Sequence, residues 1–163
     1  MPQRLWPVSL LFLAIVSAPA AQALCFEAAG KHYGVNPQLL RAIAEVESNL
    51  NPSAINRANS DKSEDLGLMQ INTQWLPVLA PYGIDRQRLL KDACLNTFIG
   101  AWILSDNFAR NGFNWDSVGG YNAGFSKKRA HLRAKYSQKV QKKLSSTYIA
   151  QFSEFNQGHK DGH

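Results

Sequence analysis

The chain has 163 residues and carries 18 Lys and Arg residues against 12 Asp and Glu residues. Hydrophobic residues make up 45% of it and charged residues 18%, which excludes a disordered chain, a collagen-like chain and a membrane protein with several spans. A small, basic, globular protein with enough residues for one domain remains.

The first 23 residues have the three parts of a secretory signal. Arg4 supplies the positive charge, residues 10–16 form an apolar core, and Ala21-Gln22-Ala23 offers a small-residue cleavage site. A retained membrane anchor is the alternative, but Pro19 follows the short apolar run, whereas a spanning helix needs about 20 residues. We therefore expect cleavage near Ala23, export of the chain, and no membrane span after cleavage.

Two cysteines, Cys25 and Cys94, occur in the whole sequence, and both lie in the exported part. Exported compartments permit disulfides, and one pair allows a single connectivity. We expect a disulfide between them; two buried free thiols are the alternative. Two thiols do not make a metal site, and the scattered histidines do not complete one, so neither a metal nor a cofactor is expected.

Helical spacing dominates the first part of the exported chain. A first helix is expected over residues 26–33 and ends at Gly34. Asn36 is a capping residue and Pro37 fits the first helical position of a second helix. Apolar residues then recur at helical spacing until Asn51-Pro52, where the run ends.

The middle of the chain is polar before it becomes helical again. Residues 53–65 are rich in turn-forming side chains, which predicts a loop or a small β-hairpin near residues 53–71. Brief helices are expected after Asn72 and after Asp85, and a long amphipathic helix is expected to start at about Asp92.

The last third contains two more predicted helices. The long helix should stop around Gly112, and a short helix should follow Asn114 or Asp116. The glycine-rich residues 119–124 are expected to interrupt regular structure, and a final basic helix is expected over residues 127–144.

The prediction as a whole is one mainly α domain over residues 24–145, with at most the small hairpin. Residues 146–163 are polar and are expected to form a flexible tail. No predicted helix is apolar on all sides, which favours a monomer.

Glu47 lies on the wrong face of the second predicted helix. At about 100° per residue it falls inside the apolar arc, beside Leu40 and Ile43, whereas Glu45 lies on the polar arc. A carboxyl group among apolar side chains loses hydration of its charged form, so its pKa should rise. A raised pKa suits a general acid. The alternative is a carboxylate that reaches solvent or pairs with a buried Arg.

Three motifs around Glu47 are familiar in this order. The chain contains Ala42-Ile43-Ala44-Glu45-Val46-Glu47-Ser48-Asn49-Leu50-Asn51-Pro52, then Gly67-Leu68-Met69-Gln70-Ile71, then Tyr121-Asn122-Ala123-Gly124. It resembles the soluble lytic transglycosylase family of peptidoglycan-cleaving enzymes over roughly residues 25–125. It is most similar to the small single-domain members that accompany type III or type IV secretion or pilus assembly, which also have a cysteine at each of these two places.

The resemblance implies a lysozyme-like helical fold, a periplasmic location and a single essential carboxylate, Glu47. This group would first protonate the oxygen that leaves C1 of N-acetylmuramic acid. As a carboxylate it would then take the proton from the C6 hydroxyl of the same sugar, which closes a 1,6-anhydro ring. An intramolecular hydroxyl needs no second carboxylate to hold a water molecule. Ser48, by the same pattern, lies beside the acid and helps to position it or the glycan.

The other two motifs imply the remaining site residues. Gly67 and its neighbours would line the groove, with Met69 and Gln70 in contact with sugars. The hydroxyl of Tyr121 would reach Glu47, and Asn122 would contact the glycan or a loop. Taken alone, the same residues would be a core segment and a packed aromatic in a turn. Four further aromatic residues are more typical of a core and are not assigned to the site: Trp75, Trp102, Trp115 and Phe125.

Eight basic residues follow the third motif, in a stretch without Asp or Glu between Asp116 and Glu154. They are Lys127, Lys128, Arg129, Arg133, Lys135, Lys139, Lys142 and Lys143. Such a run indicates either a polyanionic partner or a merely solvated face. Peptidoglycan is the polyanion that fits the motifs, and nucleic acid is not expected as a partner of an exported protein.

Two other functions stay open. A hydrolysing lysozyme of the same fold would need a second carboxylate or a held water, and Asp61, Glu64 and Asp65 are the clustered candidates. A protein that only binds peptidoglycan, or recruits an assembly machine to it, would need no acid in an apolar pocket.

Overall fold

The computed structural model describes residues 24–158. The expected signal segment, residues 1–23, and residues 159–163 of the expected tail lie outside the described residues.

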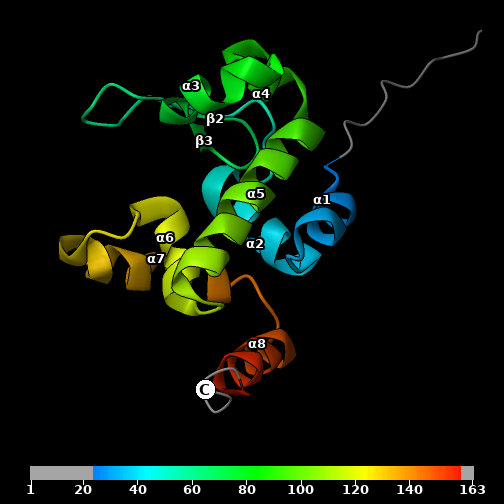
Figure 1. Cartoon of the computed structure of the whole chain (residues 1–163), viewed down its shortest axis with the longest axis vertical. Coiled ribbons are helices and arrows are strands. Elements are labelled where there is room, and N and C mark those ends of the chain that lie inside the picture. Colours follow the sequence, from blue (N-terminus) through cyan, green and yellow to red (C-terminus); the bar gives the residue numbers. More distant parts are fainter. Residues whose placement is uncertain (1–23, 159–163) are drawn as a thin grey trace, which may run out of the picture.

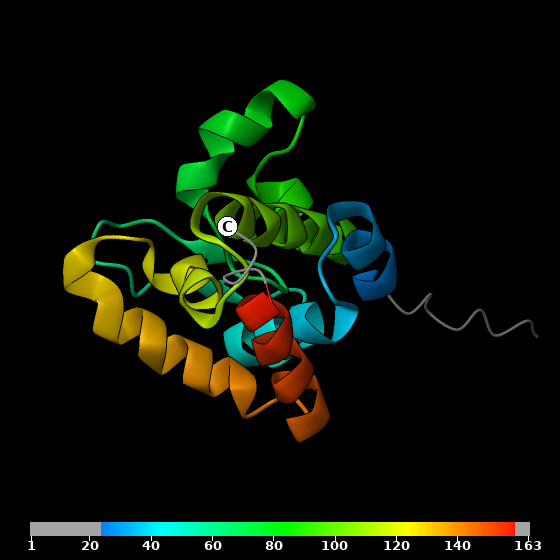
Figure 2. The ribbon, with the colours of Figure 1, turned by 60° about the horizontal axis from the view of Figure 1, so that its bottom comes forward.

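The described chain is mainly helical, and its longest helix, α5, lies at the centre (Figures 1 and 2). Four other helices and the third strand contact it. The helices are α1 (Phe26–Tyr33), α2 (Pro37–Ser48), α3 (Leu76–Leu79), α4 (Arg86–Lys91), α5 (Ala93–Asn111), α6 (Trp115–Ala123), α7 (Ala130–Gln141) and α8 (Ser146–Gly158), with short 3-10 turns over Thr73–Trp75, Ala80–Tyr82 and Lys127–Arg129. None of the helices between residues 24 and 158 is long and apolar enough to cross a membrane.

The helix starts follow the capping residues of the sequence. Helix α2 begins at Pro37. The side chain of Asn36, the residue before it, accepts a hydrogen bond from the backbone N–H of Gln38 at 2.8 Å. Asp92 and Asn114 cap α5 and α6 in the same way. Each cap satisfies a backbone donor that the first helical turn leaves unpaired.

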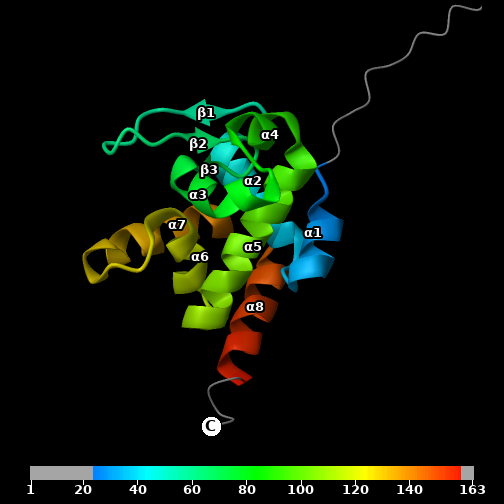
Figure 3. The ribbon, with the colours of Figure 1, turned by 45° about the horizontal axis from the view of Figure 1, so that its top comes forward.

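A three-stranded antiparallel sheet lies beside α3 and α4 (Figure 3). Its strands are β1 (Ile55–Asn56), β2 (Asp65–Leu66) and β3 (Ile71–Asn72). The predicted hairpin is confirmed, and β3 extends it. The register pairs Leu66 with Ile71 and places Asp65 between Asn56 and Asn72. Buried Leu66 and Ile71 attach the sheet to the core, and the fold is mainly α and lysozyme-like, as expected.

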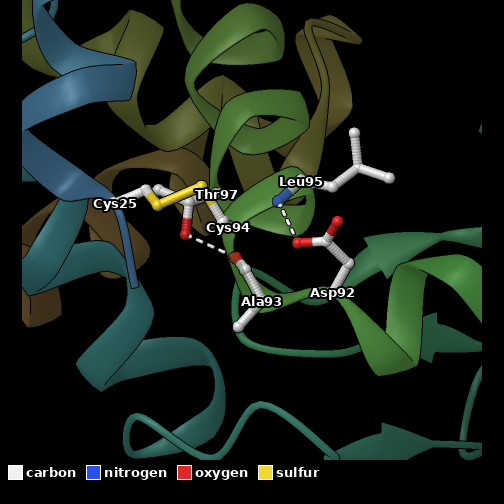
Figure 4. The surroundings of a disulfide bond; sticks show 6 residues. All are labelled: Cys25, Asp92, Ala93, Cys94, Leu95 and Thr97. Atoms are coloured by element: carbon white, nitrogen blue, oxygen red, sulfur yellow. Dashed lines mark hydrogen bonds between the residues drawn. A yellow bond between two sulfur atoms is a disulfide. The ribbon is translucent and has the colours of Figure 1, made fainter. Parts of the chain in front are cut away.

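The expected disulfide between Cys25 and Cys94 is present, with 5.0 Å between the two Cα atoms (Figure 4). It joins the residue before α1 to the first turn of α5. Asp92, which caps α5, lies beside it, so the start of the central helix is fixed both by a covalent bond and by a cap.

The prediction that residues 119–124 interrupt regular structure is wrong, because α6 continues to Ala123. Its glycines serve close packing instead. A Cβ atom at Gly119 would lie 2.4 Å from the carbonyl oxygen of Arg133, and one at Gly120 would overlap the Phe125 ring. The contact at Gly119 brings α6 directly against α7, and the one at Gly120 lets the segment after α6 fold back onto it.

The prediction of a flexible tail is also wrong for residues 146–158, which form α8. Phe152 is 3% exposed and Tyr148 6%. The Phe152 ring lies 4.2 Å from the ring of Trp115 and 4.4 Å from that of Phe113, measured between centroids. Two aromatic residues in a polar segment thus bury enough surface to hold the helix on the domain.

We therefore expect Phe152→Ala to destabilise the domain by about 3 kcal/mol, since it removes the main buried contact of α8. Glu154→Ala, an exposed change in the same helix, should leave the free energy of unfolding within about 0.5 kcal/mol of the parent value. Chemical denaturation measures both. Equal stabilities for Phe152→Ala and the parent would mean that α8 contributes nothing to the fold.

Candidate active site

A cavity of about 630 Å³ lies between the sheet, α5 and α6. Its wall includes the end of α2, the β1–β2 loop and the segment after α6. The charged side chains that line it are Glu47, Asp61, Asp65 and Arg129. The cavity therefore brings together groups that are up to 82 residues apart in the sequence.

Glu47 lies in the last turn of α2 and is partly buried, as its place in the apolar arc predicts. The pKa of Glu47 is raised from the ordinary value of 4.5 to about 7, mainly by burial. A hydrogen bond from Tyr136 and the charge of Lys139 lower this pKa, and the nearby charge of Asp65 raises it. The predicted cause, loss of hydration, is the largest of these effects. Near neutral pH both protonation states of Glu47 are populated.

Tyr136, on α7, is the residue that contacts this carboxyl group. Its hydroxyl donates to Oε1 of Glu47 at 2.5 Å, and its side chain is 4% exposed. Burial and the charge of Glu47 hold the pKa of Tyr136 well above its usual range, so the phenol keeps its proton. Sequence analysis missed Tyr136. The available signal was an aromatic residue at helical spacing with Val140 in an otherwise basic helix.

Ser48 attaches α2 to the second motif. Its hydroxyl oxygen lies 2.7 Å from the carbonyl oxygen of Leu68 and 3.2 Å from that of Ala44. The shorter contact joins the residue next to Glu47 to the segment that lines the cavity. The expectation that Ser48 helps to position Glu47 or the glycan stays a prediction.

Asn96, a fully buried residue of α5, fixes the second motif, residues 67–71, in place. Its amide donates to the carbonyls of Leu66 and Leu89, and its oxygen accepts the backbone N–H of Met69 at 2.8 Å. Gly67 has a positive φ of 77°, and a Cβ there would lie 2.4 Å from the Asn96 amide nitrogen. Sequence analysis missed Asn96, although a polar residue on the apolar side of a long helix is a usable signal.

Met69 lies in the core next to the cavity and does not line it. Its side chain is fully buried and packs against Gly100 of α5, so the expectation that this side chain contacts sugars is wrong. Gln70 does line the cavity. Its side-chain amide donates to the carbonyls of Gly67 at 2.9 Å and Ala54 at 3.3 Å, which fixes its orientation.

Tyr121 lines the cavity, but it does not make the expected hydrogen bond to Glu47. Its hydroxyl donates to the carbonyl oxygen of Met69 at 2.9 Å. Burial and the charge of Glu47 raise its pKa well above the usual range, so this donor also stays protonated. The third motif therefore supports the second motif, and Tyr136 contacts the acid. Asn122 is exposed at the cavity, and its contact with glycan stays a prediction.

Asp65 is the second carboxylate of the site. The sheet register places Asn56 and Asn72 on either side of it. Its two oxygens accept hydrogen bonds from the amides of Asn56, Asn59 and Asn72, at 2.7 to 3.0 Å. The three amide donors fix the orientation of this carboxyl group.

The other two acidic candidates are engaged elsewhere. Glu64 pairs with Arg57 and Arg86 on the outside of the sheet. Asp61 borders the cavity, but it is exposed and accepts hydrogen bonds from Ser63 and Gln74. Of the three acids, Asp65 is the one whose charge acts on Glu47.

Two aromatic side chains that sequence analysis left unassigned, Trp75 and Phe125, line the same cavity. Their flat faces are suitable for stacking on sugar rings. Among residues 24–158, no group of three or more His, Cys, Asp or Glu side chains is arranged to hold a metal ion.

The raised pKa of Glu47 has a consequence for stability. Between about pH 4.5 and 7 the unfolded chain releases this proton and the folded protein retains it, so the folded state loses relative stability as the pH rises through this range. Glu47→Gln removes that loss. We expect the variant to be about 3 kcal/mol more stable than the parent at pH 8 and about equal to it at pH 4. Urea denaturation at both pH values measures the difference, and a constant difference would contradict the raised pKa.

Comparison with known proteins places this site in a family. The family model described as "Transglycosylase SLT domain" matches residues 24–144. Invasion protein IagB of Salmonella typhi is 42% identical over 131 residues, which cover 80% of this chain and 81% of the relative.

Two further relatives are similar over most of their length. A peptidoglycan-binding-like protein of Escherichia coli O157:H7 is 40% identical over 80% of this chain and 81% of its own. Protein IpgF of Shigella flexneri is 38% identical over 73% of this chain and 78% of its own. The family match covers α1 to α7 and every residue of the cavity, and the chain therefore belongs to the transglycosylase SLT domain family.

Proposed function

We propose that this protein is a lytic transglycosylase that cleaves the β-1,4 bond between N-acetylmuramic acid and N-acetylglucosamine in peptidoglycan. The observation that carries the proposal is the carboxyl group of Glu47, with a pKa of about 7, on the wall of a cavity large enough for sugar rings. An ordinary exposed Glu would be almost fully ionised at that pH and could not act efficiently as an acid.

The reaction needs Glu47 twice. The protonated carboxyl group gives its proton to the glycosidic oxygen as the bond from that oxygen to C1 breaks. The C6 hydroxyl oxygen of the same muramic acid then bonds to C1, and its proton passes to the Glu47 carboxylate. No water is consumed, and the acid returns to its starting state. A pKa near neutrality serves both steps, because a good acid in the first step must also be an adequate base in the second.

Tyr136 and Asp65 have different parts in this scheme. The Tyr136 hydroxyl holds the carboxyl group of Glu47 in one orientation and stabilises its charged form. The Asp65 carboxylate, held in place by three asparagine amides, stabilises the positive charge that develops on the sugar ring in the transition state.

The cellular setting is part of the proposal. We place the protein in the periplasm after removal of residues 1–23, where it would open peptidoglycan locally for a secretion or pilus apparatus. The signal-like start of the sequence and the similarity to an invasion protein support this setting. No cofactor is needed for the reaction.

Incubation of residues 24–163 with purified peptidoglycan tests the reaction. We expect muropeptides that are one water lighter than hydrolysed ones, detected by mass spectrometry, because the leaving sugar is replaced by the C6 oxygen. Glu47→Gln keeps the shape of the side chain but has no proton to give, and it should release no product above background. Binding of the parent protein without release of any product would leave only a recruitment or binding role.

A second candidate, a hydrolysing lysozyme, is favoured by one observation: Asp65 provides a second carboxylate beside the same cavity. The identity of the product separates the two reactions. We expect Asp65→Asn to slow release by about 100-fold, because it removes a charge that stabilises the transition state, while the residual product stays anhydro. Asp61→Asn, at the exposed rim, should change the rate by less than about threefold. Hydrated products from the parent protein, lost in Asp65→Asn, would show a hydrolase.

A further inference from the structure

A row of lysines runs from the 3-10 turn before α7, along the exposed side of that helix, to the residue that follows it. Lys128, Lys135, Lys139 and Lys142 are separated by seven, four and three residues, the spacing that places side chains on one side of a helix. All four are exposed, and we call them the basic stripe. A different side of α7, with Tyr136 and Val140, is buried. The stripe is about 21 Å long at 1.5 Å per residue.

The stripe is not neutralised by the protein. Other basic residues of the same segment do have partners, since Arg133 pairs with Asp116 and Lys143 with Glu45. Across the part of the chain that the structure describes, no carboxylate lies within ion-pair distance of any lysine of the stripe. Four like charges on one helix face repel one another, and an anionic ligand would relieve that repulsion.

The stripe lies near the active-site cavity, although none of its lysines lines the cavity. Arg129, which follows Lys128, lines the cavity, and the charge of Lys139 lowers the pKa of Glu47. Tyr136, between the two ends of the stripe, contacts Glu47 directly. Figure 3 shows α7 beside α6, on the side of the molecule that also carries the β1–β2 loop. A substituent that leaves the cavity toward α7 would meet these lysines.

The side chains around the stripe favour a soluble anion over a membrane surface. A helix that lies on a membrane has large apolar residues beside its cationic ones. On the exposed side of α7 the neighbours of the stripe include Ala134, Gln138 and Gln141, and Leu132 is the one large apolar side chain there with substantial exposure, 41%. Charge complementarity thus selects a hydrophilic polyanion.

We propose that the basic stripe binds the carboxylates of the stem peptides of peptidoglycan, so that the protein selects glycan strands that still carry peptides. This inference rests on the proposed function, because the stem peptide is attached to the muramic acid whose C1 bond Glu47 would break. A stem peptide of a few residues, at about 3.3 Å per extended residue, spans much of the length of the stripe. Its free carboxylates are opposite in charge to the lysines.

Binding in the absence of cleavage tests the inference. The protein is residues 24–163 with Glu47→Gln, and its ligands are intact sacculi and glycan strands from which an amidase has removed the peptides. We expect about tenfold tighter binding to sacculi in 50 mM salt, and little preference in 0.5 M salt. Lys135→Glu with Lys142→Glu should abolish the preference. The matched double change Lys31→Glu with Arg88→Glu, at exposed positions on α1 and α4, should keep it. Circular dichroism and urea denaturation confirm that each variant folds.

Three results would overturn the inference. The first is equal binding of both ligands by the Glu47→Gln protein without further changes. The second is an equal loss of sacculus binding in the two double variants. The third is a stripe-dependent affinity for anionic phospholipid vesicles without a preference for peptide-bearing strands. Cleavage by the protein with Glu47 restored separates this inference from the proposed function. If neither ligand is cleaved while sacculus binding still depends on the stripe, the proposed reaction alone is wrong.

Discussion

The hydrogen bond between Tyr136 and Glu47 joins two helices whose residues are 89 positions apart, and the site depends on it. It places a protonated phenol against a carboxyl group that burial has deprived of water. Burial raises the pKa of Glu47 and the phenol lowers it, and the balance lies near 7. With burial alone the carboxyl group would be too weak an acid at neutral pH, and with the hydrogen bond from the phenol alone it would be too weak a base.

The cavity wall opposite this pair is supported by buried polar contacts. Asn96 satisfies three backbone groups around the turn at Gly67, and the Tyr121 hydroxyl satisfies the Met69 carbonyl. Buried backbone groups without such partners would cost free energy, so each side chain fixes one conformation of the segment. The disulfide at the start of α5 anchors the helix that carries Asn96 (Figure 4). The contacts of the second and third motifs thus fix the conformation of one part of the cavity wall.

Local signals in the sequence predicted the elements and the acid. Asn36 and Pro37 marked the start of α2, and the helical period alone was enough to place Glu47 on the apolar side of that helix. The same signals failed where tertiary contacts determine the local structure. Gly119 and Gly120 look like a break in a helix, but the missing side chain of Gly119 allows α6 to touch α7, and that of Gly120 leaves room for the Phe125 ring. Phe152 looks isolated in a polar tail, but it completes an aromatic cluster with Trp115.

The partners of Glu47 could not be read from the sequence for the same reason. The helical period of α7 places Tyr136 on the buried side of that helix, but it does not indicate that Tyr136 contacts the end of α2. The resemblance pointed to Tyr121, which lies at the cavity and supports Met69. Asp65 is the loop acid held by asparagine amides because the sheet register aligns it with Asn56 and Asn72.

The pKa of the Glu47 carboxyl group, followed by carbon NMR during a pH titration, tests the central claim most directly. The account predicts a value of about 7 in the parent protein. It predicts a higher value in Tyr136→Phe, because that variant loses a donor that stabilises the carboxylate. A pKa close to 4.5 in the parent protein, or a lower value in Tyr136→Phe than in the parent, would contradict it.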